Sequence, residues 1–202
     1  MKNMLRNMFY FVSTLLIFTG CNSCNKGVDD TQDTIQDSSP ITWTECGHEM
    51  GDHPCDFTLV DQDGNEWSLY DHYGEIIVLD FSTQWCYYCQ VAGAEAQALQ
   101  DSYIDKEVVY VSLLIEDNQG NTPPADGVIQ TWADTYGITA PVLGGSRDML
   151  DSTIEGGWQV TGWPTFYFID REMVIHTSMK GYSSVNLLTV LDQMLVNELL
   201  EE

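Results

Sequence analysis

Two cysteines separated by two residues, Cys86 and Cys89, follow directly on an apolar run at residues 75–81. The run predicts a strand buried on both faces, because its interior is apolar apart from one acid, Asp80. Residues 86–102 are rich in Ala and Gln and contain no Pro, which predicts a helix. The first cysteine therefore stands at a helix N-terminus, where unpaired backbone N–H groups and the positive end of the helix dipole favour a thiolate.

This spacing suits redox chemistry. A thiolate is the attacking species in disulfide exchange. A second sulfur three residues further along a helix lies on the same side and can attack the mixed disulfide that forms. A Cys-x-x-Cys pair is also half of a zinc site, but no second pair follows in this chain. The position between a strand and a helix favours a redox pair, and no metal or cofactor is predicted.

The remaining pattern predicts an α/β fold. The expected strands are 57–60, 66–69 around an Asp-Gly turn, 107–115, 141–143, 165–169 and 174–177, and the expected helices are 127–136 and 187–200. Strand, helix, strand, helix, hairpin and helix in this order predict a central mixed sheet flanked by helices. The first two strands form an N-terminal β-hairpin extension.

The charge balance excludes some partners. The chain has 7 Lys and Arg against 31 Asp and Glu, a formal net charge of -24. Such a surface repels nucleic acid and anionic lipid headgroups, so neither is expected to bind the globular part. The apolar content of 44% is sufficient for a hydrophobic core.

Residues 1–20 have the pattern of a signal peptide. Lys2 and Arg6 precede an apolar stretch at 8–18 that is short for a membrane span. The small residues before Cys21 resemble the lipobox of bacterial lipoproteins, which predicts lipidation of Cys21. An ordinary signal peptide and an uncleaved anchor are the alternatives. All three place the domain outside the cytoplasm, in an oxidising compartment of the cell envelope, facing the periplasm or the outside.

The polar, acidic stretch 21–42 shows no apolar period and predicts a flexible tether. Residues 43–202 then form the globular domain. With a lipid on Cys21, the domain would touch the membrane only through its N-terminus.

The segment 80–89 combines an acid and a Phe in a strand with Trp-Cys-x-x-Cys, and it resembles the active-site stretch of thioredoxins. Residues 56–59, with Asp-Gly at 63–64, and the segment 162–170 resemble the extracytoplasmic branch typified by TlpA and ResA. The resemblance covers the chain from Asp56 onward. It implies a thioredoxin-like fold and thiol:disulfide oxidoreductase activity.

The resemblance also implies roles for single residues. Cys86 matches the exposed nucleophile and Cys89 the buried resolving cysteine. Trp85 matches the Trp that shields the pair. Pro164 matches the cis-proline that faces the disulfide, and the residue before it, Trp163, would offer backbone hydrogen bonds to a substrate chain.

Asp80 matches the buried acid beneath the thioredoxin cysteines. An unpaired carboxylate in an apolar strand should have a raised pKa and could carry a proton to and from Cys89. The alternative is an acid that reaches solvent or a backbone donor. Tyr87 and Tyr88 replace the residues that relatives have between the cysteines, so the reduction potential does not carry over.

Two further cysteines flank a short loop, each beside a histidine: Cys46 with His48, and Cys55 with His53. A structural disulfide is expected here, because an exported protein favours disulfides and the spacings are tighter than those of zinc ligands. A metal site is the alternative.

The leading functional hypothesis is the reduction or isomerisation of cysteines in exported proteins, with a membrane thiol electron donor or acceptor as the second partner. A thiol peroxidase is the first alternative, since Thr83 lies three residues before Cys86 as in peroxiredoxins, although Leu79 stands where their Pro would be. A copper-delivering protein of thioredoxin fold, with His176 as a ligand, is the second.

Overall fold

The structure is a computed structural model that describes residues 40–151, 153–154 and 156–201. The predicted signal peptide, the lipidation site Cys21 and the tether up to residue 39 lie outside these residues. Within the described part, no helix has both the length and the apolar character that crossing a membrane requires.

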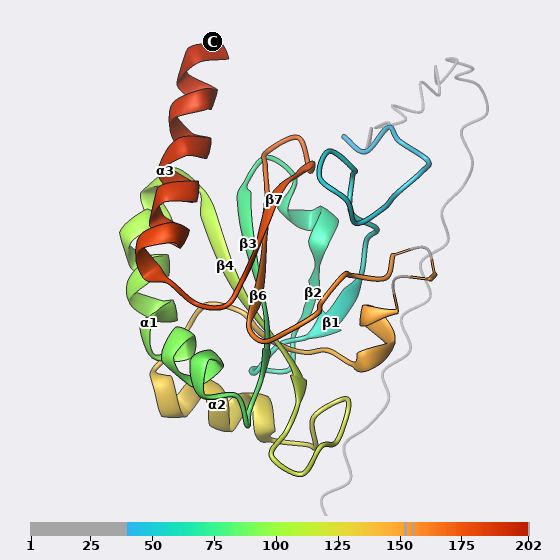
Figure 1. Cartoon of the computed structure of the whole chain (residues 1–202), viewed down its shortest axis with the longest axis vertical. Helices are drawn as coiled ribbons and strands as arrows, with labels where there is room; N and C mark the ends of the chain where they lie inside the picture. Colours follow the sequence, from blue (N-terminus) through green and yellow to red (C-terminus); the bar gives the residue numbers. More distant parts are fainter. Residues whose placement is uncertain (1–39, 152, 155, 202) are drawn as a thin grey trace, which may run out of the picture. The chain divides into compact units, whose positions relative to one another are not determined.

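A five-stranded mixed sheet forms the centre of the domain (Figure 1). Its strands are β3 (Ile76–Thr83), β4 (Val108–Glu116), β5 (Val142–Gly144), β6 (Thr165–Ile169) and β7 (Ile175–Lys180), in the spatial order β5-β4-β3-β6-β7. The pairs β3–β4 and β4–β5 are parallel, whereas β3–β6 and β6–β7 are antiparallel. Every residue of β3 is buried, as its apolar sequence predicts. The predicted mixed sheet is confirmed.

Three α-helices cover one face of the sheet: α1 (Tyr87–Tyr103), α2 (Val128–Tyr136) and α3 (Ser184–Glu201). Side chains from all three helices share one hydrophobic cluster with Ile76 and Val78 of β3. The alternate residues of β3 point into a second cluster, on the opposite face. Helix α3 begins three residues earlier than predicted, because the Ser183 hydroxyl accepts a hydrogen bond from Asn186 N (3.4 Å) at its start.

The opposite face is covered by the predicted hairpin of β1 (Thr58–Val60) and β2 (Glu66–Ser68) and by loops. The Asp61 carboxylate accepts hydrogen bonds from two turn amides, Asp63 N (2.9 Å) and Asn65 N (2.8 Å). Leu69, expected at the end of the second strand, instead starts a short 3-10 helix, Leu69–His72, and is fully buried. Two further 3-10 helices, Ile104–Lys106 and Arg147–Leu150, complete the regular elements.

Candidate active site

Cys86 occupies the N-cap position of α1 and Cys89 lies in its first turn. Cys86 Sγ accepts a hydrogen bond from Cys89 N (3.2 Å), so a backbone donor points at the sulfur that would carry a thiolate charge. Both are free thiols. Cys86 retains 8% exposure and Cys89 has 0%, so an external disulfide can reach only the first sulfur.

Asp80 lies fully buried in β3 and alternates with Ile76 and Val78, so its side chain is on the helix-covered face of the sheet. Its carboxylate accepts hydrogen bonds from Ser82 Oγ (2.7 Å) and Tyr110 Oη (2.8 Å). Burial raises the pKa of Asp80 to about 6, and these two hydroxyls oppose that rise. The direction agrees with the sequence expectation, but the carboxylate is not unpaired.

The thiol of Cys89 is strongly affected by its surroundings. Burial raises the pKa of Cys89, and hydrogen bonding with Cys86 and the negative charge of Asp80 raise it further. Cys89 therefore stays protonated until a base removes its proton. Asp80 is the buried carboxyl group whose charge acts on this thiol.

Trp85 is connected to the end of β4. Its indole Nε1 donates a hydrogen bond to Glu116 Oε2 (2.9 Å), and Glu116 also pairs with the Arg147 guanidinium. The hydrogen bond from Arg147 lowers the pKa of Glu116, so this nearly buried acid is ionised at neutral pH. The Arg147 guanidinium in turn lies over the ring of Trp163, 5.9 Å from its centroid.

Trp163 and Pro164 are joined by a cis peptide bond. Pro164 precedes β6, whose first residue, Thr165, is the register partner of Phe81 in β3. Trp163 packs against the same hydrophobic cluster that contains both cysteines. The structure therefore brings the predicted substrate-binding residues to the end of the sheet where the cysteine pair lies.

Sequence reasoning missed Glu116 and Arg147. The signal for Glu116 was an acid at the carboxyl end of a buried strand, at the edge of the sheet where Cys86 follows β3. Arg147 carries no comparable sequence signal, because only the tertiary fold places its short 3-10 helix beside Trp163.

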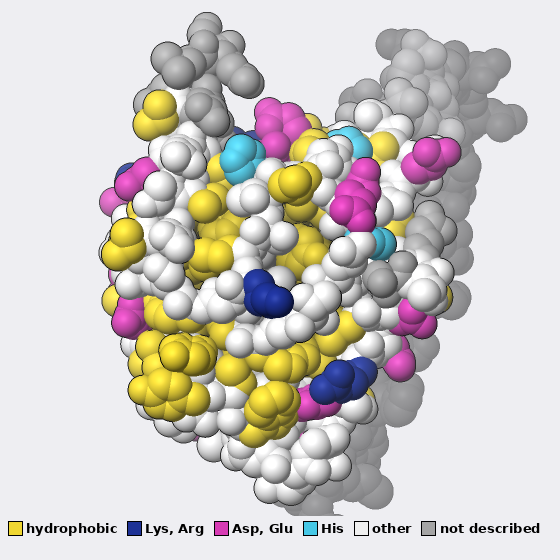
Figure 2. All heavy atoms as spheres, viewed as in Figure 1, with side chains coloured by type: hydrophobic (Ala, Val, Ile, Leu, Met, Phe, Trp, Pro, Cys, Tyr) yellow, Lys and Arg dark blue, Asp and Glu magenta, His cyan; other side chains and the backbone are white. Residues whose placement is uncertain are grey.

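The surface around Cys86 is aromatic. Trp85, Tyr87 and Tyr88, which we name the aromatic rim, are 48%, 70% and 59% exposed. The rings of Tyr87 and Tyr88 contact each other edge to face, with centroids 5.4 Å apart. Figure 2 shows hydrophobic side chains gathered over the lower end of α1, with few Lys or Arg side chains on this face. Exposed aromatic groups beside a reactive thiol are typical of a surface that contacts a protein partner.

Cys46 and Cys55 form a disulfide in the loop before β1, with their Cα atoms 4.8 Å apart. His53 Nδ1 lies 2.7 Å from the Met173 carbonyl oxygen, and the His53 ring stacks on Trp43. These contacts occupy the sulfurs and one histidine that a metal site in this loop would need. Among the described residues, no group of three His, Cys, Asp or Glu side chains could hold a metal ion.

Comparison with known proteins agrees with this architecture. Thioredoxin-like protein YneN of Bacillus subtilis (strain 168) is 29% identical over 131 residues, covering 65% of this chain and 71% of that protein. A thiol:disulfide interchange protein of the thioredoxin family from Chlorobium tepidum TLS has a TM-score of 0.59 at 19% identity, covering 74% of this chain and 99% of that one.

The exposed lipoprotein thioredoxin of Streptococcus pneumoniae strain TIGR4 has a TM-score of 0.55 at 23% identity, covering 69% of this chain and 99% of that one. These structural likenesses show a thioredoxin-like fold. The model of the AhpC/TSA family matches residues 50–178, from the disulfide loop to β7, and the chain therefore belongs to the AhpC/TSA family.

Proposed function

We propose that this protein exchanges thiols and disulfides with cysteines of exported proteins, through Cys86 and Cys89, in the reducing or isomerising direction. The observation that carries the proposal is the unequal access of the two sulfurs. Cys86 keeps 8% exposure at a helix N-cap, whereas Cys89 is fully buried and its thiol is affected by the charge of the buried Asp80. The family membership supports an oxidoreductase role in general terms.

The exchange takes place in two balanced steps. The Cys86 thiolate attacks one sulfur of the substrate disulfide, a mixed disulfide forms, and the other substrate sulfur leaves as a thiolate that takes up a proton. Cys89 then loses its proton and attacks Cys86 Sγ, which releases the second substrate sulfur as a thiol. The substrate disulfide becomes two thiols, and the enzyme dithiol becomes the Cys86–Cys89 disulfide.

Asp80 is proposed as the base for the second step. Its pKa of about 6 means that the carboxylate is ionised at neutral pH, yet it binds a proton more readily than an exposed acid does. Taking the Cys89 proton also removes the repulsion between its own charge and the new thiolate. Tyr110 remains a hydrogen-bond donor, because burial and the Asp80 charge raise its pKa.

The substrate chain is proposed to lie across Trp163 and Pro164, with its cysteine facing Cys86, and to contact the aromatic rim. A lipid-anchored location in the cell envelope, with a membrane thiol donor or acceptor as electron partner, is part of the same proposal. It is supported by the similarity to an exposed lipoprotein thioredoxin and to a thiol:disulfide interchange protein.

The decisive measurement is the equilibrium reduction potential of the Cys86–Cys89 pair, combined with trapping. We expect a two-electron couple nearer to thioredoxin's value of roughly −270 mV than to the roughly −120 mV of a strong oxidant. Cys89→Ser should accumulate a mixed disulfide with a substrate protein, and Cys86→Ser should form none. The absence of a two-electron couple in the wild type would remove the proposal and bring Cu(I) titration forward as the next experiment.

A thiol peroxidase is the second candidate, favoured by one observation. The hydroxyl of Thr83 is buried and has no hydrogen-bond partner among the described residues, and Thr83 O accepts a hydrogen bond from Cys86 N (3.3 Å). In this reaction the Cys86 thiolate would attack one peroxide oxygen and break the O–O bond, so that a sulfenic acid forms and the other oxygen leaves as hydroxide, which takes up a proton to become water. The Cys89 thiol would then condense with the sulfenic acid to give a disulfide and a second water. Consumption of hydrogen peroxide, with Thr83→Val as the matched variant, separates the two candidates.

A further inference from the structure

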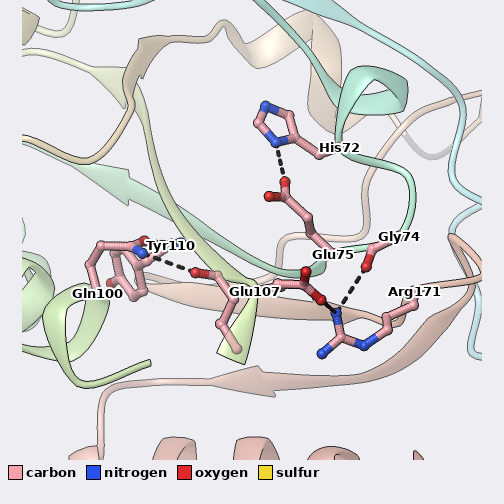
Figure 3. A network of polar contacts seen from close by, with 8 residues as sticks. His72, Gly74, Glu75, Gln100, Glu107, Tyr110 and Arg171 are labelled. Carbon is pink, nitrogen blue, oxygen red and sulfur yellow. Dashed lines mark hydrogen bonds and ion pairs between the residues drawn. The ribbon is translucent and has the colours of Figure 1, made fainter. Parts of the chain in front are cut away.

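The described part of this acidic chain contains four Lys and Arg residues, and two of them lie at the end of the sheet away from the cysteines. The Lys106 ammonium lies 4.4 Å from the centroid of the Tyr103 ring. Arg171 pairs with Glu107 (2.9 Å), beside Gly74 at the start of β3 (Figure 3). Both cations therefore have partners within the domain.

The other two cations lie at the end that carries the candidate active site. The charge of Arg147 is balanced by Glu116. Lys180 is exposed and has no ion pair and no cation–π contact with any described residue. Among the four described Lys and Arg residues, Lys180 is therefore the one with neither an ion pair nor a cation–π contact.

Lys180 borders the loop that contains the cis-proline. It is the last residue of β7 and the register partner of Thr165, and the next amide, Gly181 N, donates to Pro164 O (2.8 Å). A Cβ atom built on Gly162 would lie 3.0 Å from Lys180 Cδ, so the aliphatic stem of the lysine packs against the backbone beside Trp163. The ammonium group is thereby held next to the proposed path of the substrate chain.

An open cavity of about 260 Å³ continues from this point along β6 and β7. Lys180 lines it together with the hydroxyl-bearing residues Thr161, Thr165 and Ser178. The cavity is also lined by Glu49, whose carboxylate accepts a hydrogen bond from Gln159 Nε2 (2.6 Å). The cavity thus offers an ammonium group without an ion pair and several hydroxyl groups, a combination that suits a carboxylate, while its one lining carboxylate, Glu49, lies beside Gln159 and His48.

We propose that Lys180 is a specificity-determining residue that selects partner cysteines with an acidic side chain one or two residues away. The inference rests on the proposed function, since it takes the substrate chain to cross Trp163 and Pro164. An extended chain advances about 3.3 Å per residue, and neighbouring strands lie about 4.8 Å apart, so Lys180 is within reach of such a side chain. The exchange chemistry at the cysteines is unchanged.

The net charge of -24 works against this selectivity, because the overall electrostatic field of the protein favours basic peptides. The long-range field of a negatively charged protein repels acidic peptides and attracts basic ones. A preference for acidic peptides would therefore have to come from a local contact. Lys180 is positioned to make that contact.

The test uses three peptides of one sequence with Glu, Gln or Lys two residues before a single cysteine. The cysteine is held as a mixed disulfide with 4-thiopyridine, an uncharged leaving group. The reduced full-length protein attacks the peptide sulfur, and the released chromophore reports the rate. We expect the Glu peptide to react about three- to fivefold faster than the Gln peptide at low salt, and the Lys peptide to be slowest.

Matched variants assign the effect. Lys180→Gln should abolish the difference between the Glu and Gln peptides, whereas Lys180→Arg and Lys106→Gln should retain it. A Lys peptide that reacts as fast as the Glu peptide with the wild type would overturn the role of Lys180, and so would a difference that survives in Lys180→Gln. If no peptide releases the chromophore, the proposed exchange function itself fails, which is a distinct result.

Discussion

The indole nitrogen of Trp85 donates a hydrogen bond to the carboxylate of Glu116, 2.9 Å away. This contact joins the residue before Cys86 to the end of the neighbouring strand β4. Through Arg147, the same carboxylate is connected to Trp163 on the other side of the site. One nearly buried acid is therefore linked to Trp85 directly and to Trp163 through Arg147.

Glu116→Ala should lower the free energy of unfolding by about 1–3 kcal/mol, because it leaves the Trp85 N–H and the Arg147 guanidinium without their shared acceptor. Glu116→Gln keeps an acceptor for Trp85 and should lose less. Urea unfolding of the reduced protein measures both changes.

Glu107→Gln is the matched control, since Glu107 also pairs with an arginine but its side chain is 72% exposed. It should change the unfolding free energy by less than about 0.5 kcal/mol. Equal losses for Glu107→Gln and Glu116→Ala would contradict the special position of Glu116.

Asp80 should make stability depend on pH. Because the folded pKa of about 6 exceeds the ordinary aspartate value of 3.8, the folded state retains a proton that the unfolded state releases. The wild type therefore loses stability as pH rises from about 4 through 6, and Asp80→Asn does not. At pH 8 the variant should be more stable by up to about 3 kcal/mol, and the difference should vanish below about pH 4. Urea unfolding at pH 4, 6 and 8 tests this.

The same variant should slow release of the substrate from the mixed disulfide by about 10²-fold, if Asp80 takes the Cys89 proton. In the wild type this step should accelerate as pH rises through about 6. Asp134→Asn, on the exposed face of α2, is the control for a surface carboxylate. An unchanged rate and pH profile in Asp80→Asn would contradict the assignment of Asp80 as the base.

Removing the disulfide with Cys46→Ala and Cys55→Ala should lower the free energy of unfolding by about 2–3 kcal/mol, from the closure of a loop with a sequence separation of 9. Added reductant should then no longer change the free energy of unfolding of the variant. A loss below about 0.5 kcal/mol would show that the loop is held by its other contacts, including the stacking of His53 on Trp43.

Gly93 allows α1 and α2 to approach closely. A Cβ atom at this position would lie 2.9 Å from Trp132 Cζ2 and 3.1 Å from Tyr136 Cδ2. Gly93→Ala should therefore destabilise the protein by about 1–2 kcal/mol, although Ala is the better helix former by about 1 kcal/mol. Trp132→Phe should relieve the clash, so thermal unfolding of the double variant should show that the two effects are not additive.

Much of the architecture was predictable because its signals are local. An apolar run predicts the buried strand before Cys86, a helix-forming stretch predicts the helix after it, and turn residues predict the hairpins. Each of these signals occupies a few consecutive positions. The errors were also local. Leu69 left the strand pattern for a 3-10 helix, and Ser183 started α3 earlier than its apolar period predicts.

Only the tertiary structure decided which side chains meet at the site. The Asp80 carboxylate accepts a hydrogen bond from Tyr110 because β3 and β4 pair in parallel. The same register places Glu116, at the end of β4, where it accepts a hydrogen bond from Trp85. Lys180 reaches the cis-proline loop through the pairing of β6 and β7. Strand register and loop paths determine contacts between residues far apart in sequence, and local propensity carries no information about them. The sequence therefore determined the fold class and the cysteine pair, whereas the packing determined the groups that surround it.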